Sequence, residues 1–367
     1  MIYYLSQFLT PHWGPFRLLQ SHALLLAGGA FTAAFLTLFA LPRLWDRLPR
    51  DRGKAICKDL GGMKSAGKPT GAGYYVTLLL LPVVLVFAPL KFWDLMTVLL
   101  MYGAMLFGYL DDRASVPWGE LRKGLLDAVV SIAIACCLFF GHAEHVADGL
   151  KMIVWLPFVK SLWHVPFWAY VPAAAFILWF TMNATNCSDG VDGLAGTLTV
   201  ITLVMLAVIL YVVVGYRPVA HYFLIPVYAE AARWAIVVLI AAGGFGGYLW
   251  YNAEPSKILM GDAGSRFLGI LVATASLMTG NPLLILALSP VVLVNGGGGL
   301  GKLVLLRLAK RLGFDIGEDN VIRKIRFPLH DHCKKNLGWS NAQVLMRFVL
   351  LQLIVMPILL ILLIKIR

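Results

Sequence analysis

The chain has 367 residues, of which 60% are hydrophobic and only 14% charged, whereas a soluble protein carries nearer a quarter charged residues. Apolar runs of about 17 to 25 residues recur along its whole length, which is typical of transmembrane helices and excludes an ordinary soluble protein. The formal net charge of +12 indicates membrane topology, or a field for anionic substrates, rather than a nucleic-acid partner, because no soluble domain is present to hold a duplex.

We therefore expect one polytopic membrane domain over residues 1–367, an all-α fold of about ten transmembrane helices. The connections Gly141–Val165 and Gly215–Arg233 are rich in Trp, Tyr and Pro and are interpreted as interfacial segments. The first 16 residues contain no Lys or Arg, which argues against a removable signal peptide. The predicted spans are roughly His22–Leu41, Gly73–Ala88, Leu95–Leu110, Gly124–Phe140, Pro166–Ala184, Asp192–Val214, Trp234–Tyr251, Gly264–Thr279, Pro282–Leu308 and Asn341–Ile364.

Two strongly basic segments predict how the chain is oriented. Segment 43–71 holds eight Lys and Arg residues and segment 302–335 holds nine, whereas the segments on the opposite side hold far fewer per residue. Because cytoplasmic loops carry an excess of Lys and Arg, both basic segments should be cytoplasmic. Ten spans then place both termini outside.

The stretch Asn183–Gly196 is polar although it lies between two long apolar runs. Asp189 and Asp192 are three residues apart, so they share one face if the next helix begins there. An Asp-Gly step by itself is more typical of a helix cap than of a site. Polar groups at membrane depth are costly, however, and therefore indicate function.

Other carboxylates border spans on the same predicted side. Asp111 and Asp112 end the third span, at the helix terminus where negative charge is disfavoured and needs compensation such as a cation. Asp262 lies in the small-residue turn before the eighth span. Each feature alone also fits a solvated helix boundary or a simple turn. Asn252, His330 and His332 complete the set on this side.

Such a cluster of hard oxygen ligands suits Mg²⁺, which takes one or two carboxylates together with substrate phosphate oxygens. Transfer of a phosphoryl group between a soluble donor and a lipid phosphate would require this placement at the membrane face. A metal would neutralise the pyrophosphate, and a carboxylate could accept the acceptor's proton.

Two patterns resemble sites that we do not expect. Gly296–Leu303 nearly matches a phosphate-binding loop, but Leu303 stands where Ser or Thr would hold Mg²⁺, so a broken or closely packed transmembrane helix is the better interpretation. His330 and His332 would share a face on an extended strand, but without further ligands nearby a zinc site is disfavoured. Contact with a phosphate or ribose, or a loop without a role, remains open.

Taken together, these motifs resemble the polyprenyl-phosphate N-acetylhexosamine-1-phosphate transferase superfamily, and within it the phospho-N-acetylmuramoyl-pentapeptide transferases of bacterial cell-wall synthesis. The resemblance covers nearly the whole chain. Its most specific part is the Asn-x-x-Asn-x-x-Asp-Gly-x-Asp-Gly-Leu-Ala stretch that begins at Asn183. The loop from Phe327 to His332 favours this group over relatives that use N-acetylglucosamine donors.

The resemblance implies Mg²⁺-dependent transfer of phospho-MurNAc-pentapeptide from its UDP carrier to undecaprenyl phosphate, which yields lipid I and UMP. It also implies a multi-pass protein of the bacterial cytoplasmic membrane, with the active site facing the cytoplasm, and a homodimer. By position, Asp111 resembles the proposed base, Asp112 its support, and Asp262 the principal Mg²⁺ ligand. The implied substrate contacts are Lys123, Asn183, Asn186, Asp189, Gly190, Val191, Asp192, Asn252, Lys302, His330 and His332.

Some positions depart from the family pattern. Asp331 replaces the middle residue of a histidine triplet, Leu259 stands where a Phe is common, Lys302 replaces a Gln and Asn295 a Glu. These changes leave the carboxylates intact but affect the expected nucleotide pocket, so a sister enzyme that uses UDP-N-acetylglucosamine is the nearest alternative. A secondary transporter is an alternative of another class, and it predicts acids near the membrane midplane and a two-fold repeat.

Overall fold

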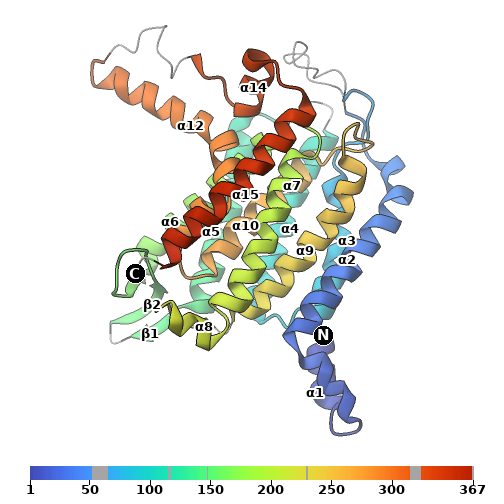
Figure 1. The fold of residues 1–367 in the computed structure, drawn as a ribbon, viewed down its shortest axis with the longest axis vertical. Coiled ribbons are helices and arrows are strands. Elements are labelled where there is room, and N and C mark those ends of the chain that lie inside the picture. The colour runs from blue at the N-terminus through green and yellow to red at the C-terminus, as the bar shows by residue number, and fades with distance from the viewer. Residues whose placement is uncertain are drawn as a thin grey trace.

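The computed structural model describes residues 1–51, 65–114, 116, 118–146, 148–228, 230–314 and 324–365, which form a mainly helical bundle (Figure 1). Parts of the predicted basic segments, 52–64 and 315–323, lie outside the described residues. Within the described ranges, eight helices are long and apolar enough to cross a membrane. The chain is a multi-pass membrane protein, as its composition predicts.

Each predicted span overlaps a helix of the structure, and the ninth overlaps two. Two of those spans correspond to the shorter helices α3 and α10, of 16 and 17 residues. The long helices are α2 (His22–Leu44), α4 (Phe92–Arg113), α5 (Glu120–His142), α6 (Phe167–Ser188), α7 (Leu194–Val208, continued by a π-helical turn over Ile209–Val213), α9 (Ala231–Asn252), α12 (Pro290–Arg311) and α15 (Asn341–Lys365). The shorter ones are α1 (Ile2–Leu9), α3 (Ala72–Phe87), α8 (Arg217–Tyr222), α10 (Gly261–Leu277), α11 (Leu284–Leu288) and α14 (Leu329–Leu337).

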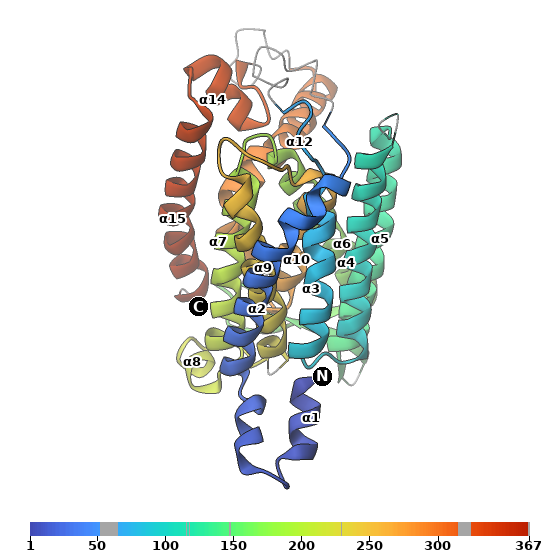
Figure 2. The same cartoon turned by 90° about the vertical axis from the view of Figure 1, so that its right-hand side faces the viewer.

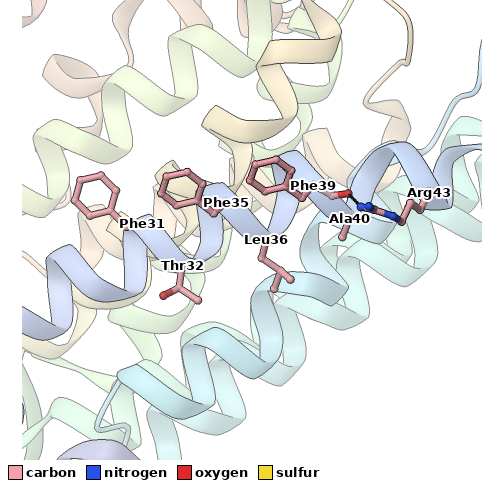
Figure 3. A pocket seen from close by; sticks show the side chains of 7 residues that line it. All are labelled: Phe31, Thr32, Phe35, Leu36, Phe39, Ala40 and Arg43. Carbon is pink, nitrogen blue, oxygen red and sulfur yellow. Dashed lines mark hydrogen bonds between the residues drawn. The ribbon is translucent and has the colours of Figure 1, made fainter.

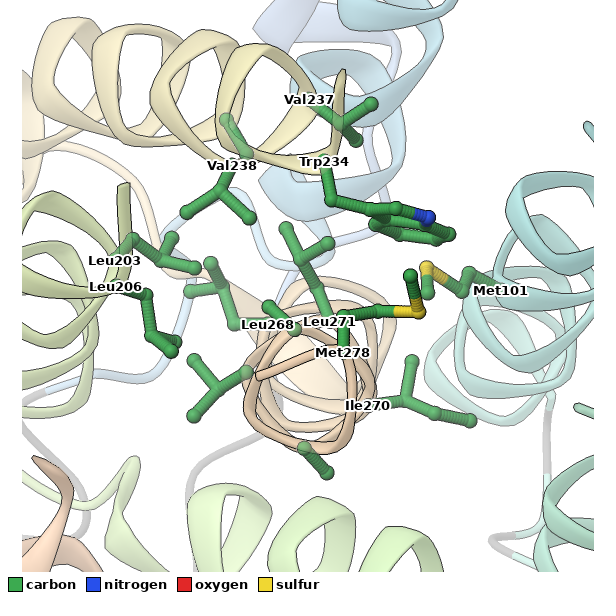
Figure 4. Packing of buried hydrophobic residues seen from close by; sticks show 14 of the residues in the cluster. Met101, Leu203, Leu206, Trp234, Val237, Val238, Leu268, Ile270, Leu271 and Met278 are labelled. Carbon is green, nitrogen blue, oxygen red and sulfur yellow. The ribbon is translucent and has the colours of Figure 1, made fainter. Parts of the chain in front are cut away.

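Helix α10 is the centre of the bundle. Every residue from Ala263 to Leu277 is buried, and the helix packs against α3, α4, α6, α7 and α9. Figure 4 shows Trp234 of α9, Leu203 of α7 and Met101 of α4 arranged around it. A helix that is enclosed on every side has little freedom to shift, so whatever its first turn carries is held firmly.

Helix α14 lies at one end of the bundle, and both marked ends of the chain lie toward the other (Figure 2). Near the chain ends, an antiparallel sheet of β1 (Glu144–Val146), β2 (Gly149–Val154) and β3 (Trp163–Pro166) occupies the predicted interfacial segment. In its register Met152 is paired with Val165. The sequence prediction of an all-α chain holds for the bundle and omits this sheet, because strands of three to six residues carry almost no periodic signal.

The predicted ninth span, Pro282–Leu308, is interrupted between α11 and α12. Pro290 begins α12, and Gln352 of α15 supplies the hydrogen bonds that the break leaves open. Its Nε2 donates to the Leu288 carbonyl at 2.5 Å and its Oε1 accepts the Val291 N–H at 3.3 Å. A break at membrane depth is tolerated only where such partners are buried with it.

The glycine run of α12 packs closely, as predicted, and forms no phosphate-binding loop. A Cβ on Gly296 would lie 1.9 Å from the Ala184 carbonyl oxygen of α6, and one on Gly298 would lie 2.2 Å from the Phe327 ring. Beyond the glycines, α12 leaves the body of the bundle (Figure 1) and exposes apolar side chains such as Leu303 and Leu308.

Candidate active site

Four predicted site residues meet at the end of the bundle that carries α14. Asp111 and Asp112 end α4, Lys123 lies in the first turn of α5, and Asp262 lies in the first turn of α10. The Lys123 ammonium is 2.6 Å from Oδ2 of Asp111 and 3.7 Å from Oδ2 of Asp262. One cation thus joins carboxylates from two helices, and we call these four residues the carboxylate cluster.

The two carboxylates that contact Lys123 differ in their exposure. The Asp111 side chain is 7% exposed, and its second oxygen accepts the Trp118 N–H at 2.7 Å. The Asp262 side chain is 25% exposed. Of the two carboxylates that contact Lys123, Asp262 is therefore the more open to a ligand from water.

Asp112 caps the first turn of α10. Its two oxygens accept the N–H groups of Asp262 and Ala263 at 3.2 and 3.3 Å, where the helix dipole favours negative charge. Gly261 has a φ of +72°, and a Cβ there would lie 2.4 Å from Asp112 Oδ2. A Cβ on Gly108 of α4 would lie 2.5 Å from the Asp262 carbonyl oxygen. Glycines therefore let α4 approach α10, and the compensation that the acidic pair needs comes from Lys123 and this helix terminus.

A buried ion pair that the sequence reasoning missed lies beneath the cluster. Asp127 of α5 and Arg266 of α10 are bonded to each other, with side chains only 1% and 3% exposed. Arg266 Nη2 is also 3.5 Å from Oδ2 of Asp262. The available signal was a lone charge inside each of two predicted spans, Gly124–Phe140 and Gly264–Thr279, since such charges are rarely left without partners.

Asn186 and Asn183 lie in the last turns of α6. Asn186 Oδ1 accepts the Ser265 hydroxyl at 2.9 Å, which ties the end of α6 to the helix that carries Asp262. Asn183 Nδ2 instead donates to the Trp179 carbonyl of its own helix at 2.9 Å. Of the two predicted amides, Asn186 is thus the one bonded to α10.

The segment 189–193 is a loop, so the expectation that Asp189 and Asp192 share one helix face is wrong. Helix α6 continues to Ser188 and α7 begins only at Leu194, after Gly193 in the left-handed conformation. The physical reason is that the backbone leaves the helical conformation at Asp189, the C-cap of α6, and turns at Gly193, the N-cap of α7, whose φ of +76° favours glycine.

Asp192 and Asn252 form a second group, which fixes this loop to the end of α9. Asp192 Oδ2 accepts the Ser256 N–H at 3.1 Å and is 3.5 Å from the Lys68 ammonium. Asn252 Oδ1 accepts the Gly193 N–H at 2.9 Å, and its Nδ2 donates to the Ile258 carbonyl at 2.8 Å. With both amide atoms bonded to backbone, Asn252 acts by holding two loops in place.

The remaining predicted residues gather around α14. Asn295 Oδ1 accepts the His330 N–H at 2.8 Å and lies 3.1 Å from His330 Nδ1. A Cβ on Gly190 would lie 2.2 Å from His330 Nε2, so only glycine lets the loop approach this ring. Val191 is buried in an apolar cluster with Cys333. His330 thus packs directly against the Asp-Gly loop.

His332 and Lys302 bond to backbone groups near α14. His332 Nδ1 accepts the Arg326 N–H at 3.2 Å, and Lys302 Nζ donates to the Ile325 carbonyl at 2.7 Å. Because this segment is helical, residues two apart point in different directions, and His330 and His332 do not share the face that a strand would give them.

The carboxylate cluster fits Mg²⁺ with two protein ligands. A single ammonium already contacts oxygens of both Asp111 and Asp262, so a small cation could be reached by the same two carboxylates. Among the described residues no three His, Cys, Asp or Glu side chains form a ready-made metal site. That agrees with an ion which uses one or two carboxylates and completes its coordination with water and substrate phosphate.

A groove elsewhere on the molecule has a different character. It is about 640 Å³ in volume and is lined by one face of α2, with Phe31, Phe35 and Phe39 in a row that ends at Arg43 (Figure 3). The three rings are more than half exposed. Such a row on a membrane-spanning helix is a surface for lipid, and it contains none of the predicted site residues.

Comparisons with known proteins identify the family of this chain. Residues 95–280, which contain the carboxylate cluster, match the model of glycosyl transferase family 4. The chain is 42% identical over 348 residues to a phospho-N-acetylmuramoyl-pentapeptide-transferase of Treponema pallidum (strain Nichols), and the match covers 94% of this chain and 91% of that one.

More distant relatives bear the same name. The protein of Borreliella afzelii (strain PKo) is 28% identical, covering 92% of this chain and 95% of its own. That of Koribacter versatilis (strain Ellin345) is 29% identical over 95% of each chain. Since a family model matches half of the chain and a relative at 42% identity matches nearly all of it, the chain belongs to glycosyl transferase family 4.

Proposed function

We propose that this protein transfers phospho-MurNAc-pentapeptide from UDP-MurNAc-pentapeptide to undecaprenyl phosphate, forming lipid I and UMP in peptidoglycan synthesis. The observation that carries the proposal is its 42% identity, along 94% of the chain, to a transferase of that name. The carboxylate cluster at one end of a membrane bundle supports it, because this reaction joins a soluble donor to a lipid acceptor.

The chemistry calls for cations at the point of reaction. An oxygen of the lipid phosphate attacks the donor phosphorus that bears the sugar. A new P–O bond forms, the bond to the uridine phosphate breaks, and UMP leaves. Both reactants are anionic, so positive charge must be fixed where they meet. Lys123, which lies between Asp111 and Asp262, supports the proposal because it is a cation beside both proposed reacting carboxylates.

The residues divide into reacting and positioning groups. Asp111 acts as the base toward the lipid phosphate, and Asp262 is the principal Mg²⁺ ligand, with Asp111 as the second carboxylate within reach. A bound Mg²⁺ would neutralise charge on the pyrophosphate and the departing UMP. Asp112 and Asn252 act by positioning, since their polar atoms are bonded to backbone. The donor contacts we propose are Lys123, Asn183, Asn186, Asp189, Gly190, Val191, Asp192, Lys302, His330 and His332.

The location and assembly follow from the same proposal. The described parts of the two basic segments lie beside the predicted site residues, with the Lys68 ammonium 3.5 Å from Asp192 and Lys302 Nζ bonded to the Ile325 carbonyl near α14, which supports a cytoplasmic active site in the bacterial inner membrane. The family resemblance supports a homodimer. The predicted site acids Asp111, Asp112 and Asp262 gather at one end of the bundle rather than at its middle, which favours an enzyme over a secondary transporter.

The test is UMP release by detergent-purified protein with Mg²⁺ and undecaprenyl phosphate. UDP-MurNAc-pentapeptide and UDP-N-acetylglucosamine are offered separately, and Asp262→Asn is the matched inactive control. We expect turnover with the muramoyl donor alone. Turnover with UDP-N-acetylglucosamine alone would support the same transfer reaction with a different donor. If folded protein released no UMP with either donor, the proposal would be wrong.

A further inference from the structure

Helices α5 and α10 are joined by four side chains of alternating charge. Each helix contributes one base and one acid spaced four residues apart, Lys123 and Asp127 on α5, Asp262 and Arg266 on α10. Lys123 is 3.7 Å from Asp262, Arg266 is bonded to Asp127, and Arg266 Nη2 is 3.5 Å from Asp262. We call these four residues the charge ladder. Its outer pair, Lys123 and Asp262, belongs to the carboxylate cluster.

The inner pair is poorly suited to a purely stabilising role. Asp127 and Arg266 are almost completely buried, yet Asp127 Oδ2 and Arg266 Nε make no hydrogen bond with the described part of the chain. A buried ion pair gains stability only when its remaining polar atoms are satisfied, and apolar residues of similar volume often do better. The retained charges therefore call for another explanation.

That explanation lies in the two carboxylates open to Arg266. Its guanidinium is bonded to Asp127 but only loosely placed against Asp262, which precedes it by four residues on the same face of α10. A buried guanidinium must be paired. If Asp127 lost its charge, Asp262 would be the acid closest to Arg266. A full ion pair between Arg266 and Asp262 would then neutralise the Asp262 carboxylate.

We propose that Asp127 is a positioning residue that keeps Arg266 from neutralising Asp262, and thereby sets how tightly Asp262 holds a divalent cation. The inference rests on the metal-binding role of Asp262 under the proposed function. Because Asp127 and Arg266 together carry no net charge, the pair leaves Asp262 free to attract a cation. Arg266 remains close enough to orient its carboxylate.

The experiment measures Mn²⁺ binding to the detergent-purified protein without substrates, by electron paramagnetic resonance of the free ion. Mn²⁺ prefers the same oxygen ligands as Mg²⁺. We expect Asp127→Asn to weaken binding roughly tenfold, through a net positive charge close to Asp262. The double variant Asp127→Asn/Arg266→Gln should bind within about threefold of wild type, because its charge balance is that of wild type again.

Two further variants frame the result. Asp262→Asn should abolish this binding. Asp94→Asn, which neutralises another acid with a 2% exposed side chain at the opposite end of α4, should leave it unchanged. Size-exclusion profiles and thermal unfolding check that each variant is folded. If Asp127→Asn does not fold, Arg266→Gln tests the inference in the opposite direction. It removes the competing cation, so Mn²⁺ binding should become tighter.

Several outcomes overturn the inference. A folded Asp127→Asn protein that binds Mn²⁺ with wild-type affinity would overturn it. A double variant that binds Mn²⁺ as weakly as Asp127→Asn would also overturn it, because the loss would then come from structural damage rather than from charge. Arg266→Gln with unchanged or weaker binding would also do so. Wild-type protein that releases UMP without binding Mn²⁺ through Asp262 overturns the inference and leaves the transfer reaction intact. The expected Mn²⁺ pattern without any UMP release supports the inference while the proposed function fails.

Discussion

Helix α4 carries a buried aspartate near each end, and the two have opposite surroundings. Asp94 accepts hydrogen bonds from Trp234 Nε1 at 2.8 Å, His142 Nε2 at 3.1 Å and the Lys91 N–H at 3.3 Å. Asp111 shares the Lys123 ammonium with the partly exposed Asp262. The Asp94 carboxylate is surrounded by hydrogen-bond donors from α5, from α9 and from Lys91, which precedes α4. The Asp111 carboxylate belongs to a cluster that includes the partly exposed Asp262. Burial of an acid therefore does not identify a site, but the openness of its neighbours does.

The largest effect should come from Asp262→Asn. We expect UMP release to fall by at least about 10³-fold, because the amide removes the carboxylate that we propose as the principal Mg²⁺ ligand. The free energy of unfolding should change by no more than about 1 kcal/mol, since the side chain is partly exposed. Paired rate and thermal-unfolding measurements check this. Rates near those of wild type would remove the metal assignment.

Asp111→Asn should lower the rate by about 10²- to 10³-fold, because an amide cannot accept a proton and no longer attracts Lys123. A single-turnover assay with saturating donor separates this loss from weaker binding. Asp111→Glu is the control, because it keeps a carboxylate on a longer side chain. If Asp111→Asn retained full single-turnover rates, the base role would have to be assigned elsewhere.

Asp94→Asn tests the sealed end of the same helix. The amide weakens hydrogen bonds from Trp234 and His142, so we expect the free energy of unfolding to drop by about 1–3 kcal/mol. The rate per folded molecule should be unchanged. Thermal unfolding in detergent and activity are measured in parallel. A large loss of rate at unchanged stability would mean that Asp94, like Asp111, acts in the reaction.

The smallest effect is expected for Ser265→Ala. Its hydroxyl bonds to Asn186 Oδ1 at 2.9 Å, so removal frees the end of α6 from α10 without touching a carboxylate. We expect less than a tenfold change in rate, about 1 kcal/mol, with the larger share in KM for the donor. Steady-state kinetics measure this. Thr199→Ala in α7, where the hydroxyl bonds only within its own helix, is the matched control.

The apolar runs predicted the helices well because length and hydropathy are local properties. Ser340-Asn341-Ala342-Gln343 before the last span is another local pattern, a capping box, and the structure forms it: Ser340 Oγ accepts the Gln343 N–H at 3.2 Å and Gln343 Oε1 accepts the Ser340 N–H at 3.0 Å. The local sequence pattern did not predict the interruption between α11 and α12, just before Pro290. Its hydrogen bonds come from Gln352, about sixty residues later in the chain.

Asp111, Asp112 and Asp262 were predicted from residue types at span boundaries and Lys123 from the family resemblance, and the structure brings these four residues together. Asp127 and Arg266 were missed because each looks like an isolated charge until α5 and α10 are placed near each other. The role of Asp112 as a cap on a helix 150 residues away was equally out of reach. Contacts across helices depend on packing, which a linear pattern does not contain.

In the described structure α10 is buried from Ala263 to Leu277, and its first two residues, Gly261 and Asp262, are partly exposed at the end of the bundle. Under the proposed function, the head group of an acceptor lipid would reach Asp262 at this end, while its hydrocarbon tail would stay among the bulk lipids. Recognition of such an acceptor would depend on the head group and the first few carbons. Lipids with tails of quite different lengths should then serve almost equally well.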